Sequence, residues 1–207
     1  MKIESQSFEI LTEISHNAEK ELRLIEKAGR TCYKSEPGDF ERCKNFIRNI
    51  INSGHESVLE HSSLTVKFIT SRSVSHQLVR HRLCAFSQES QRYCNYTKDR
   101  FSNEITFIPP VGLTEGEFEA WKRSCINDEY EYNRAIANGK SPETARAILP
   151  NCTKTEIVVT ANYREWRHIF KERTSSRADA SMRDLMIPLL SRLYFDIPVI
   201  FEDMKEI

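Results

Sequence analysis

The sequence predicts an α+β fold (mixed α/β). Segments whose apolar residues alternate with polar ones, as in strands, are interspersed with segments whose apolar residues recur at helical spacing. The two kinds of segment are mixed without the strict alternation that is typical of a parallel α/β fold. With 207 residues the chain can bury a full core, so we expect one domain that spans residues 1–207.

The N-terminal third predicts two strands and two helices. Residues 8–14 alternate weakly and suit a strand, whereas residues 19–29 have helical spacing, with Gly29 as the expected stop. Residues 39–53 carry a single apolar stripe that ends at Gly54, which predicts a stronger helix. Residues 64–69 place Leu64, Val66 and Phe68 on one side and therefore predict a strand.

The middle of the chain predicts a short helix, an extended loop, a strand and a long helix. Residues 74–80 suit the short helix, and residues 86–94 suit a loop or extended chain. Residues 105–108 predict a strand that is stopped by two prolines. The long helix covers residues 114–138, because Thr114 can cap it and Gly139 can end it.

The C-terminal third predicts three helices and one strand. Ser141 can cap a helix that has Pro142 in its first turn and ends before Pro150. Residues 155–161 are rich in β-branched side chains and predict a strand. Residues 162–172 and 178–192 predict helices, and the residues after Met204 are expected to form a frayed tail.

Composition restricts the classes of protein. Lys+Arg and Asp+Glu are both 30, and this zero formal charge disfavours a non-specific nucleic-acid binder. The chain has no N-terminal apolar segment and no stretch that approaches a membrane span, so we expect a cytoplasmic protein without a membrane partner. Its six cysteines include no Cys-x-x-Cys pair and are interpreted as reduced thiols. The spacing of His55 and His61 is not a usual zinc pattern, so we predict no metal site.

A run of fourteen residues from Arg80 to Tyr93 is the most informative motif. It contains three arginines, one histidine, two serines and two glutamines around a short apolar stretch. A guanidinium group grips a phosphate through two hydrogen bonds, and three such groups in thirteen residues repel one another unless an anion binds. The apolar residues 83–86 argue against a merely solvated basic face, so we predict an anion site. Ser90 lacks a visible base partner and is interpreted as a binding group rather than a nucleophile.

Three further clusters are candidates for the same site. Residues 54–61 bunch polar and acidic groups after a helix end, and Arg146 lies in a short helix. In the helix that starts at Asn162, helical spacing stacks Arg164, His168 and Glu172 on one face. Together the clusters offer arginines, amides and histidines without an evident nucleophile–base pair. This set favours an organic cofactor with phosphates and a phosphorylated substrate.

The signature run also resembles a known family. Its form is Arg-His-Arg, seven residues, Ser, and then Arg-Tyr two residues after that Ser. This form resembles the signature of the flavin-dependent thymidylate synthases, the ThyX family. Residues 54–61, Arg146 with Ile148-Leu149-Pro150, and residues 162–173 resemble further segments of that family, in its order and spacing.

The resemblance implies a methyltransferase of dTMP biosynthesis that converts dUMP to dTMP. Methylenetetrahydrofolate is expected to give the carbon, and reduced FAD, recharged by NADPH, the hydride. The resemblance also implies a central, mostly antiparallel sheet flanked by helices, and a homotetramer whose active sites are shared between subunits.

The resemblance assigns roles residue by residue. Arg173 is the expected catalytic residue, because a cation beside the uracil ring would make its C5 nucleophilic. The residues expected to contact FAD are His55, Ser57, Glu60, Arg80, His81, Arg82, Gln88, Asn162, Arg164 and His168. Those expected to bind dUMP are Gln77, Arg80, Gln88, Glu89, Ser90, Gln91, Arg92, Arg146 and Arg173.

Two other classes of protein are alternatives. A single-stranded nucleic-acid binding module would place arginines on phosphates and stack Tyr93, Tyr96 and Trp166 on bases. A nucleotide hydrolase would use a metal in the region of His55 and His61. Steep salt dependence of oligonucleotide binding would favour the first alternative, and loss of activity with a chelator would favour the second.

Overall fold

A computed structural model describes residues 1–204, except for the side chains of Tyr33 and Arg100. The tail expected after Met204 lies outside the described residues. The chain divides into two compact units. The first unit contains Met1–Phe8, Lys67–Arg80 and Phe86–Val158, and the second contains Glu9–Val66, His81–Ala85 and the described residues from Val159 onward. A single domain over residues 1–207 stays a prediction.

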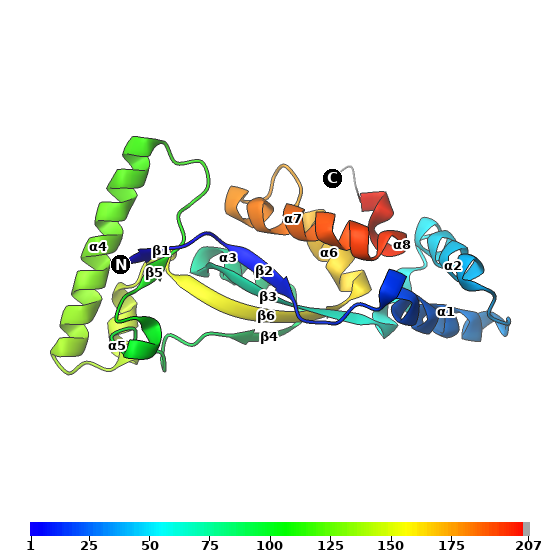
Figure 1. The fold of residues 1–207 in the computed structure, drawn as a ribbon, viewed down its shortest axis with the longest axis horizontal. Coiled ribbons are helices and arrows are strands. Elements are labelled where there is room, and N and C mark those ends of the chain that lie inside the picture. The colour runs from blue at the N-terminus through cyan, green and yellow to red at the C-terminus, as the bar shows by residue number, and fades with distance from the viewer. Residues whose placement is uncertain (205–207) are drawn as a thin grey trace. The chain divides into compact units, whose positions relative to one another are not determined.

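The main sheet has four strands in the order β2 (Ser7–Ile10), β3 (Ser63–Ser71), β6 (Lys154–Asn162) and β4 (Ala85–Gln88). Buried and less buried residues alternate along β3 and β6, as expected for a sheet with one covered face. Leu64, Val66 and Phe68 are all buried, as predicted. The predicted class, a mixed α+β fold with an antiparallel sheet flanked by helices, is confirmed (Figure 1).

The first unit is built around one long helix, α4 (Glu115–Ala137). This helix starts at a capping box of Thr114 and Glu117, and it ends before Gly139, which has a φ of 80°. Both predicted ends of α4 are therefore confirmed. Beside α4, β1 (Lys2–Ile3) pairs in parallel with β5 (Thr106–Phe107) (Figure 1). The other elements of this unit are α3 (Arg72–Leu78), η3 (Asp99–Phe101), α5 (Pro142–Ala145) and η4 (Arg146–Ile148).

The second unit is mainly helical. Trp166 and Phe170 of one helix pack with Phe201 in its core, and all three side chains are buried. Its elements are η1 (His16–Ala18), α1 (Glu19–Tyr33), α2 (Phe40–Asn52), η2 (Glu56–His61), α6 (Tyr163–Arg173), α7 (Ala180–Asp196), α8 (Pro198–Phe201) and η5 (Glu202–Met204). The helices predicted over residues 39–53, 162–172 and 178–192 correspond to α2, α6 and α7.

The predicted stop at Gly29 is wrong, because α1 continues to Tyr33. A Cβ on Gly29 would lie 2.8 Å from the ring of Phe46, so the missing side chain allows α1 to approach α2. The helix ends instead at Lys34, which has a left-handed φ of 47°.

The strand predicted over residues 8–14 is shorter than expected, because β2 ends at Ile10. The amides of Leu11 and Thr12 both donate to the carbonyl of Thr65, at 2.9 and 3.3 Å, and this sharing interrupts the regular ladder. None of the helices in the described residues combines the length and apolarity that crossing a bilayer requires.

Candidate active site

Helix α6 presents one face of the candidate site in the second unit. It starts at Asn162, whose side chain accepts a hydrogen bond from the Glu165 amide at 2.9 Å. Arg164 and His168 are exposed on the helix, whereas Trp166 is buried. The cap and the polar face agree with the sequence prediction.

His81 lies against this helix and brings three predicted residues together. Arg173 donates from Nε to His81 Nε2 at 3.0 Å, and His81 Nδ1 lies 3.6 Å from Glu165 Oε1. The ring of His168 meets that of His81 edge to face, with centroids 5.6 Å apart. The side chain of Glu165 was not singled out from the sequence.

The environment of His81 keeps its imidazole neutral. Burial, reinforced by the positive charges of Arg173 and His168, lowers the pKa of His81 to about 4. Because Nε2 accepts a hydrogen bond, this bonding pattern assigns the ring proton to Nδ1, on the side of Glu165. Burial also raises the pKa of Glu165. His81 therefore fixes Arg173 through a neutral acceptor that does not cancel the guanidinium charge.

The same cluster contains a set of potential metal ligands. His81, Glu165 and His168 offer one ligand atom each, and these atoms lie within 4.8 Å of one another. The sequence spacing did not indicate this set, because His81 comes from a distant segment. Arg173 donates to a ring nitrogen of His81 and so places a cation beside the set, which opposes a second cation. The absence of a metal stays a prediction.

A cavity of about 590 Å³ opens beside α6 and η2. Arg164 pairs with Glu60 at 2.5 Å, and both side chains belong to the cavity wall. His55 directly precedes η2 and Ser57 lies within it. Both residues are exposed but do not line this cavity. Its walls are formed by Glu56, Glu60, Leu83, Asn162, Arg164, Glu165, His168 and Lys171.

Two arginines of the signature run are exposed. Among the described residues, neither Arg80 nor Arg82 forms an ion pair with a carboxylate. An exposed guanidinium without an internal partner is available for an anionic ligand. The anion-binding role of the run stays a prediction.

In the first unit, strand β4 and helix α3 each carry one predicted residue. Gln88 donates from Nε2 to Ser75 Oγ at 2.8 Å and to Thr155 Oγ1 at 3.1 Å, so its amide is held in one orientation. Gln77, on α3, is half-buried.

The next residue, Glu89, is held by its own set of contacts. Its carboxylate accepts a hydrogen bond from the Tyr96 hydroxyl at 2.7 Å, and its amide donates to the Glu156 carbonyl at 2.8 Å. Glu89 therefore contributes an ordered acidic group to the cavity described below.

The chain turns directly after β4, at Ser90. The carbonyl of Ser90 accepts from the amides of Tyr93 and Cys94, at 3.1 and 2.9 Å, and its hydroxyl accepts from the Arg92 amide at 3.3 Å. Gln91, in this turn, has a buried side-chain nitrogen Nε2 with no hydrogen-bond partner. Because a buried amide without a partner is energetically costly, this nitrogen can donate a hydrogen bond to a ligand.

Arg92 and Arg146 meet at one residue of α5. Arg92 Nε lies 2.7 Å from Glu143 Oε1, and Arg146 Nε donates to the Glu143 carbonyl at 3.3 Å. The structure thus joins two arginines that were predicted to bind dUMP and that come from separate parts of the sequence. Glu143 was not predicted, since a glutamate in the first turn of a helix reads as ordinary helix chemistry.

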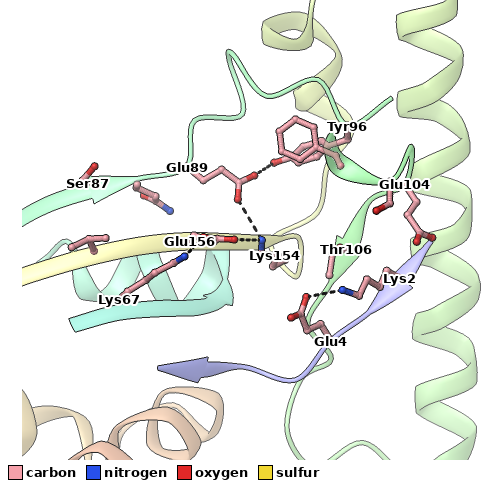
Figure 2. Close-up of a pocket in the computed structure, with 14 residues that line it drawn as sticks. Lys2, Glu4, Lys67, Ser87, Glu89, Tyr96, Glu104, Thr106, Lys154 and Glu156 are labelled. Carbon is pink, nitrogen blue, oxygen red and sulfur yellow. Dashed lines mark hydrogen bonds and ion pairs between the residues drawn. The ribbon is translucent and has the colours of Figure 1, made fainter. Parts of the chain in front are cut away.

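A larger cavity, of about 680 Å³, lies in the first unit and was not predicted (Figure 2). The Nζ atom of Lys154 lies 3.8 Å from Glu89 Oε2 and 2.7 Å from Glu156 Oε1. The Nζ atom of Lys67 lies 2.6 Å from Glu156 Oε2. Ion pairs with these lysines, Lys154 first, lower the pKa of Glu156. The sequence signal for this cavity was the spacing of Lys154 and Glu156, because residues two apart on a strand place their side chains on the same face of the sheet.

Comparison with solved structures agrees with the observed class of fold. The chain is similar to a UMP/dUMP methylase, PolB, from Streptomyces cacaoi bound with 5-Br dUMP, with a TM-score of 0.81 and 20% identity. The similarity covers 98% of this chain and 96% of that one. At this identity it shows a shared fold, the mixed α+β fold of that methylase.

Sequence comparisons show the family. The family described as "Thymidylate synthase complementing protein" matches residues 13–199. A flavin-dependent thymidylate synthase of Mycobacterium sp. (strain KMS) is 37% identical, over 91% of this chain and 82% of its own length. One from Corynebacterium aurimucosum is 34% identical, over 92% and 83% respectively. The chain belongs to the flavin-dependent thymidylate synthase family and is therefore an enzyme of the methyltransferase class, as the resemblance implied.

Proposed function

We propose that this protein is a flavin-dependent thymidylate synthase that methylates dUMP to dTMP. In this proposal methylenetetrahydrofolate donates the carbon, and FAD, reduced by NADPH, provides the reducing equivalents. Membership of the family supports the reaction. The observation that carries the assignment to this chain is the contact of Arg173 with neutral His81 beside the polar face of α6.

The proposed catalytic step is electrostatic. Arg173 would lie beside the uracil ring and stabilise the negative charge that develops there, which makes C5 of the ring a better nucleophile. His81 would orient the guanidinium, since its Nε2 accepts from Arg173 Nε at 3.0 Å. His81 stays neutral near pH 7, so this contact adds no opposing charge beside Arg173.

The side chains of the second unit fit a flavin dinucleotide. FAD combines two negatively charged phosphates with planar rings. The wall of the cavity beside α6 contains the cations Arg164 and Lys171 and the ring of His168. The cations can bind the phosphates, and the imidazole can pack against a planar ring. We propose that FAD contacts these residues together with His55, Ser57, Glu60, Arg80, His81, Arg82, Gln88 and Asn162. When bound and reduced, the flavin would supply the electrons of the reaction.

The side chains of the first unit fit a nucleoside monophosphate. Arg92 and Arg146 converge on Glu143 and can together hold a phosphate. The unpartnered amide nitrogen of Gln91 can donate to an oxygen of the nucleotide. We propose that dUMP binds here, with contacts from Gln77, Arg80, Gln88, Glu89 and Ser90 as well as from Arg173.

We further propose that the protein is a cytoplasmic homotetramer with active sites shared between subunits. The family resemblance is the basis of the tetramer proposal. All six cysteines are free, which agrees with a reducing compartment.

An absorbance spectrum of the purified protein, followed by titration with dUMP, tests the proposal. We expect the two absorption bands of oxidised flavin, and we expect them to shift on addition of dUMP. Turnover with methylenetetrahydrofolate and NADPH should then yield dTMP. A protein that neither retains nor takes up FAD would contradict the proposal.

A pair of variants tests the substrate site. Arg146→Gln should weaken dUMP binding by about 10- to 100-fold, because it removes a charge-assisted contact to phosphate. Arg123→Gln is the matched control, because Arg123 is an exposed arginine of α4 in the same unit. Equal dUMP affinity of the two variants would remove Arg146 from the site.

A further inference from the structure

Two cysteines that the proposed reaction does not use lie together in the first unit. Cys125 is on α4 and belongs to a hydrophobic cluster with Phe107 and Tyr132. Cys152 packs against the same cluster from the turn that precedes β6. The carbonyl of Cys152 accepts a hydrogen bond from the Ile108 amide at 2.9 Å, which fixes the backbone of this turn.

The two sulfur atoms are in contact. Sγ of Cys125 lies 3.7 Å from Sγ of Cys152, and the two thiols share a hydrogen bond. A disulfide needs sulfurs about 2.05 Å apart, so the gap closes with a shift of under about 2 Å, within the reach of side-chain rotation. The other free cysteines are Cys32, Cys43, Cys84 and Cys94.

The environments of the two thiols are unequal. Cys125 is 1% exposed, whereas Cys152 is only partly buried. The hydrogen bond between the two thiols lowers the pKa of Cys152, although burial opposes it, and the same bond and burial raise the pKa of Cys125. The carboxylate of Asp128 disfavours a negative charge on either sulfur, and burial raises its own pKa. The partly exposed Cys152 is therefore the thiol that ionises more readily, and the thiolate is the reactive form.

We propose that Cys125 and Cys152 form a reversible redox modification site that hydrogen peroxide or an organic hydroperoxide converts to a disulfide. The Cys152 thiolate attacks a peroxide oxygen, the O–O bond breaks, and the leaving oxygen takes a proton and departs as water or alcohol. The Cys125 sulfur then attacks the resulting sulfenic acid, the S–O bond breaks, and water leaves with the Cys125 proton. The two thiols lose two electrons, which the peroxide gains.

The disulfide would close a loop that contains α5 and Arg146. It would attach the turn before β6 to α4 by a covalent bond, and a small thiol such as glutathione would reverse it by exchange. The site does not depend on the proposed function, because neither cysteine has a role in that proposal.

Peptide mapping of the wild-type protein tests the inference. The folded protein is treated with a few equivalents of hydrogen peroxide, blocked by alkylation and digested with trypsin. We expect the intact mass to fall by two hydrogen atoms, and peptide 124–134 to be linked to peptide 147–154. Glutathione should restore the thiols, and the exposed thiol of Cys32 should react more slowly. If both cysteines stay alkylatable while Cys32 is oxidised, the inference is wrong.

Single variants separate the two steps. In Cys125→Ser the Cys152 sulfenic acid has no partner thiol, so dimedone should trap it on peptide 147–154. In Cys152→Ser, Cys125 should stay unreacted under the same peroxide treatment. Dimedone labelling of Cys125 in the second variant would contradict the assigned roles. The wild-type mapping decides the question even if a variant fails to fold.

Discussion

At the scale of single residues, Arg173 is held by an unusual partner for a cation. One acceptor is a ring nitrogen of His81, itself 6% exposed. A histidine can accept such a bond only in its neutral form, so the low pKa of His81 and the position of Arg173 support each other. The two residues belong to one arrangement, and a change in one should be measurable in the other.

Removal of the Arg173 side chain should reduce dTMP formation more than it reduces FAD binding. Arg173→Ala should lower dTMP formation by at least about 100-fold and leave FAD largely bound, because the lost charge acts on the reacting ring. Turnover and flavin content of the purified variant measure the two effects. Arg177→Ala is the control, because Arg177 is exposed four residues further along. Turnover close to that of the wild type would remove Arg173 from the catalytic role.

The low pKa of His81 should make the free energy of unfolding depend on pH. The unfolded chain protonates this imidazole near pH 6.5 and the folded protein only near about 4, so between these values the unfolded state binds more protons. The contribution of His81 to stability is complete above about pH 6.5, falls as the pH decreases, and is lost below about pH 4. Its size is about 3 kcal/mol at most.

Urea unfolding of the wild type and of His81→Gln across this pH range measures the contribution of His81. Glutamine keeps an acceptor for Arg173 but does not titrate, so the difference between the two proteins isolates His81. We expect the wild type to lose more stability than the variant as the pH falls. Parallel curves would show that the histidine has an ordinary pKa.

The sequence predicted the cations of the site but not two of the carboxylates beside them, Glu143 and Glu165. Arg92 stands out because it belongs to the arginine cluster of the signature run, whereas Arg146 was predicted only from the family resemblance of its segment. Their common contact with Glu143 depends on how the turn after β4 meets α5, and local spacing does not encode such a meeting. Glu165 was missed for the same reason, since its partner His81 comes from a distant segment.

At the scale of elements, α6 is attached to the loop that carries predicted flavin contacts. The guanidinium of Arg167, 2% exposed, donates to Glu56 at 3.1 Å and to Asp203 at 2.6 Å, and also to the Ile200 carbonyl. Burial raises the pKa of Asp203, but the bonds and charge of Arg167 outweigh burial and lower it. The buried guanidinium group of Arg167 therefore links η2 and η5 to α6.

Arg167→Met should destabilise the protein by about 3 kcal/mol, because it leaves two carboxylates and a carbonyl without their partner. It should also weaken FAD retention, since Glu56 belongs to η2. The control for stability alone is Arg164→Met, on the same helix, where an exposed ion pair with Glu60 is lost and the cost should stay below about 1 kcal/mol. Urea unfolding compares the two, and equal losses would show that Arg167 is not an anchor.

The long helices and strands were predicted from the sequence. Some of their ends, and the shortest strands, were harder to predict. Helix α4 was predicted at both ends because its cap and its terminal glycine are local signals. Gly29 was misread because its role, to let α1 approach Phe46, is tertiary. The two-residue strands β1 and β5 are too short for periodicity and depend on a pairing over a hundred residues of chain.

At the scale of the whole molecule, the chain passes repeatedly between its two units. The unit boundaries fall inside β2, β3 and β6 and at the start of β4, so each of the four strands begins in one unit and ends in the other. The proposed FAD residues lie mainly in the second unit, and the proposed dUMP residues mainly in the first. The predicted single domain has a thermodynamic consequence, because the elements of one cooperative domain unfold together.

That consequence is a single cooperative transition, and the two tryptophans can report it. Trp121 lies in the first unit, and Trp166, whose Nε1 donates to the Leu64 carbonyl at 3.0 Å, lies in the second. Trp166→Phe leaves only Trp121, and Trp121→Phe leaves only Trp166. In each variant we expect tryptophan fluorescence and far-ultraviolet circular dichroism to change at the same urea concentration, because all strands must separate together. Trp166→Phe should shift both probes to lower urea, since it removes a buried hydrogen bond. Fluorescence of Trp121 that changes apart from the circular dichroism would mean that the two units are separate domains.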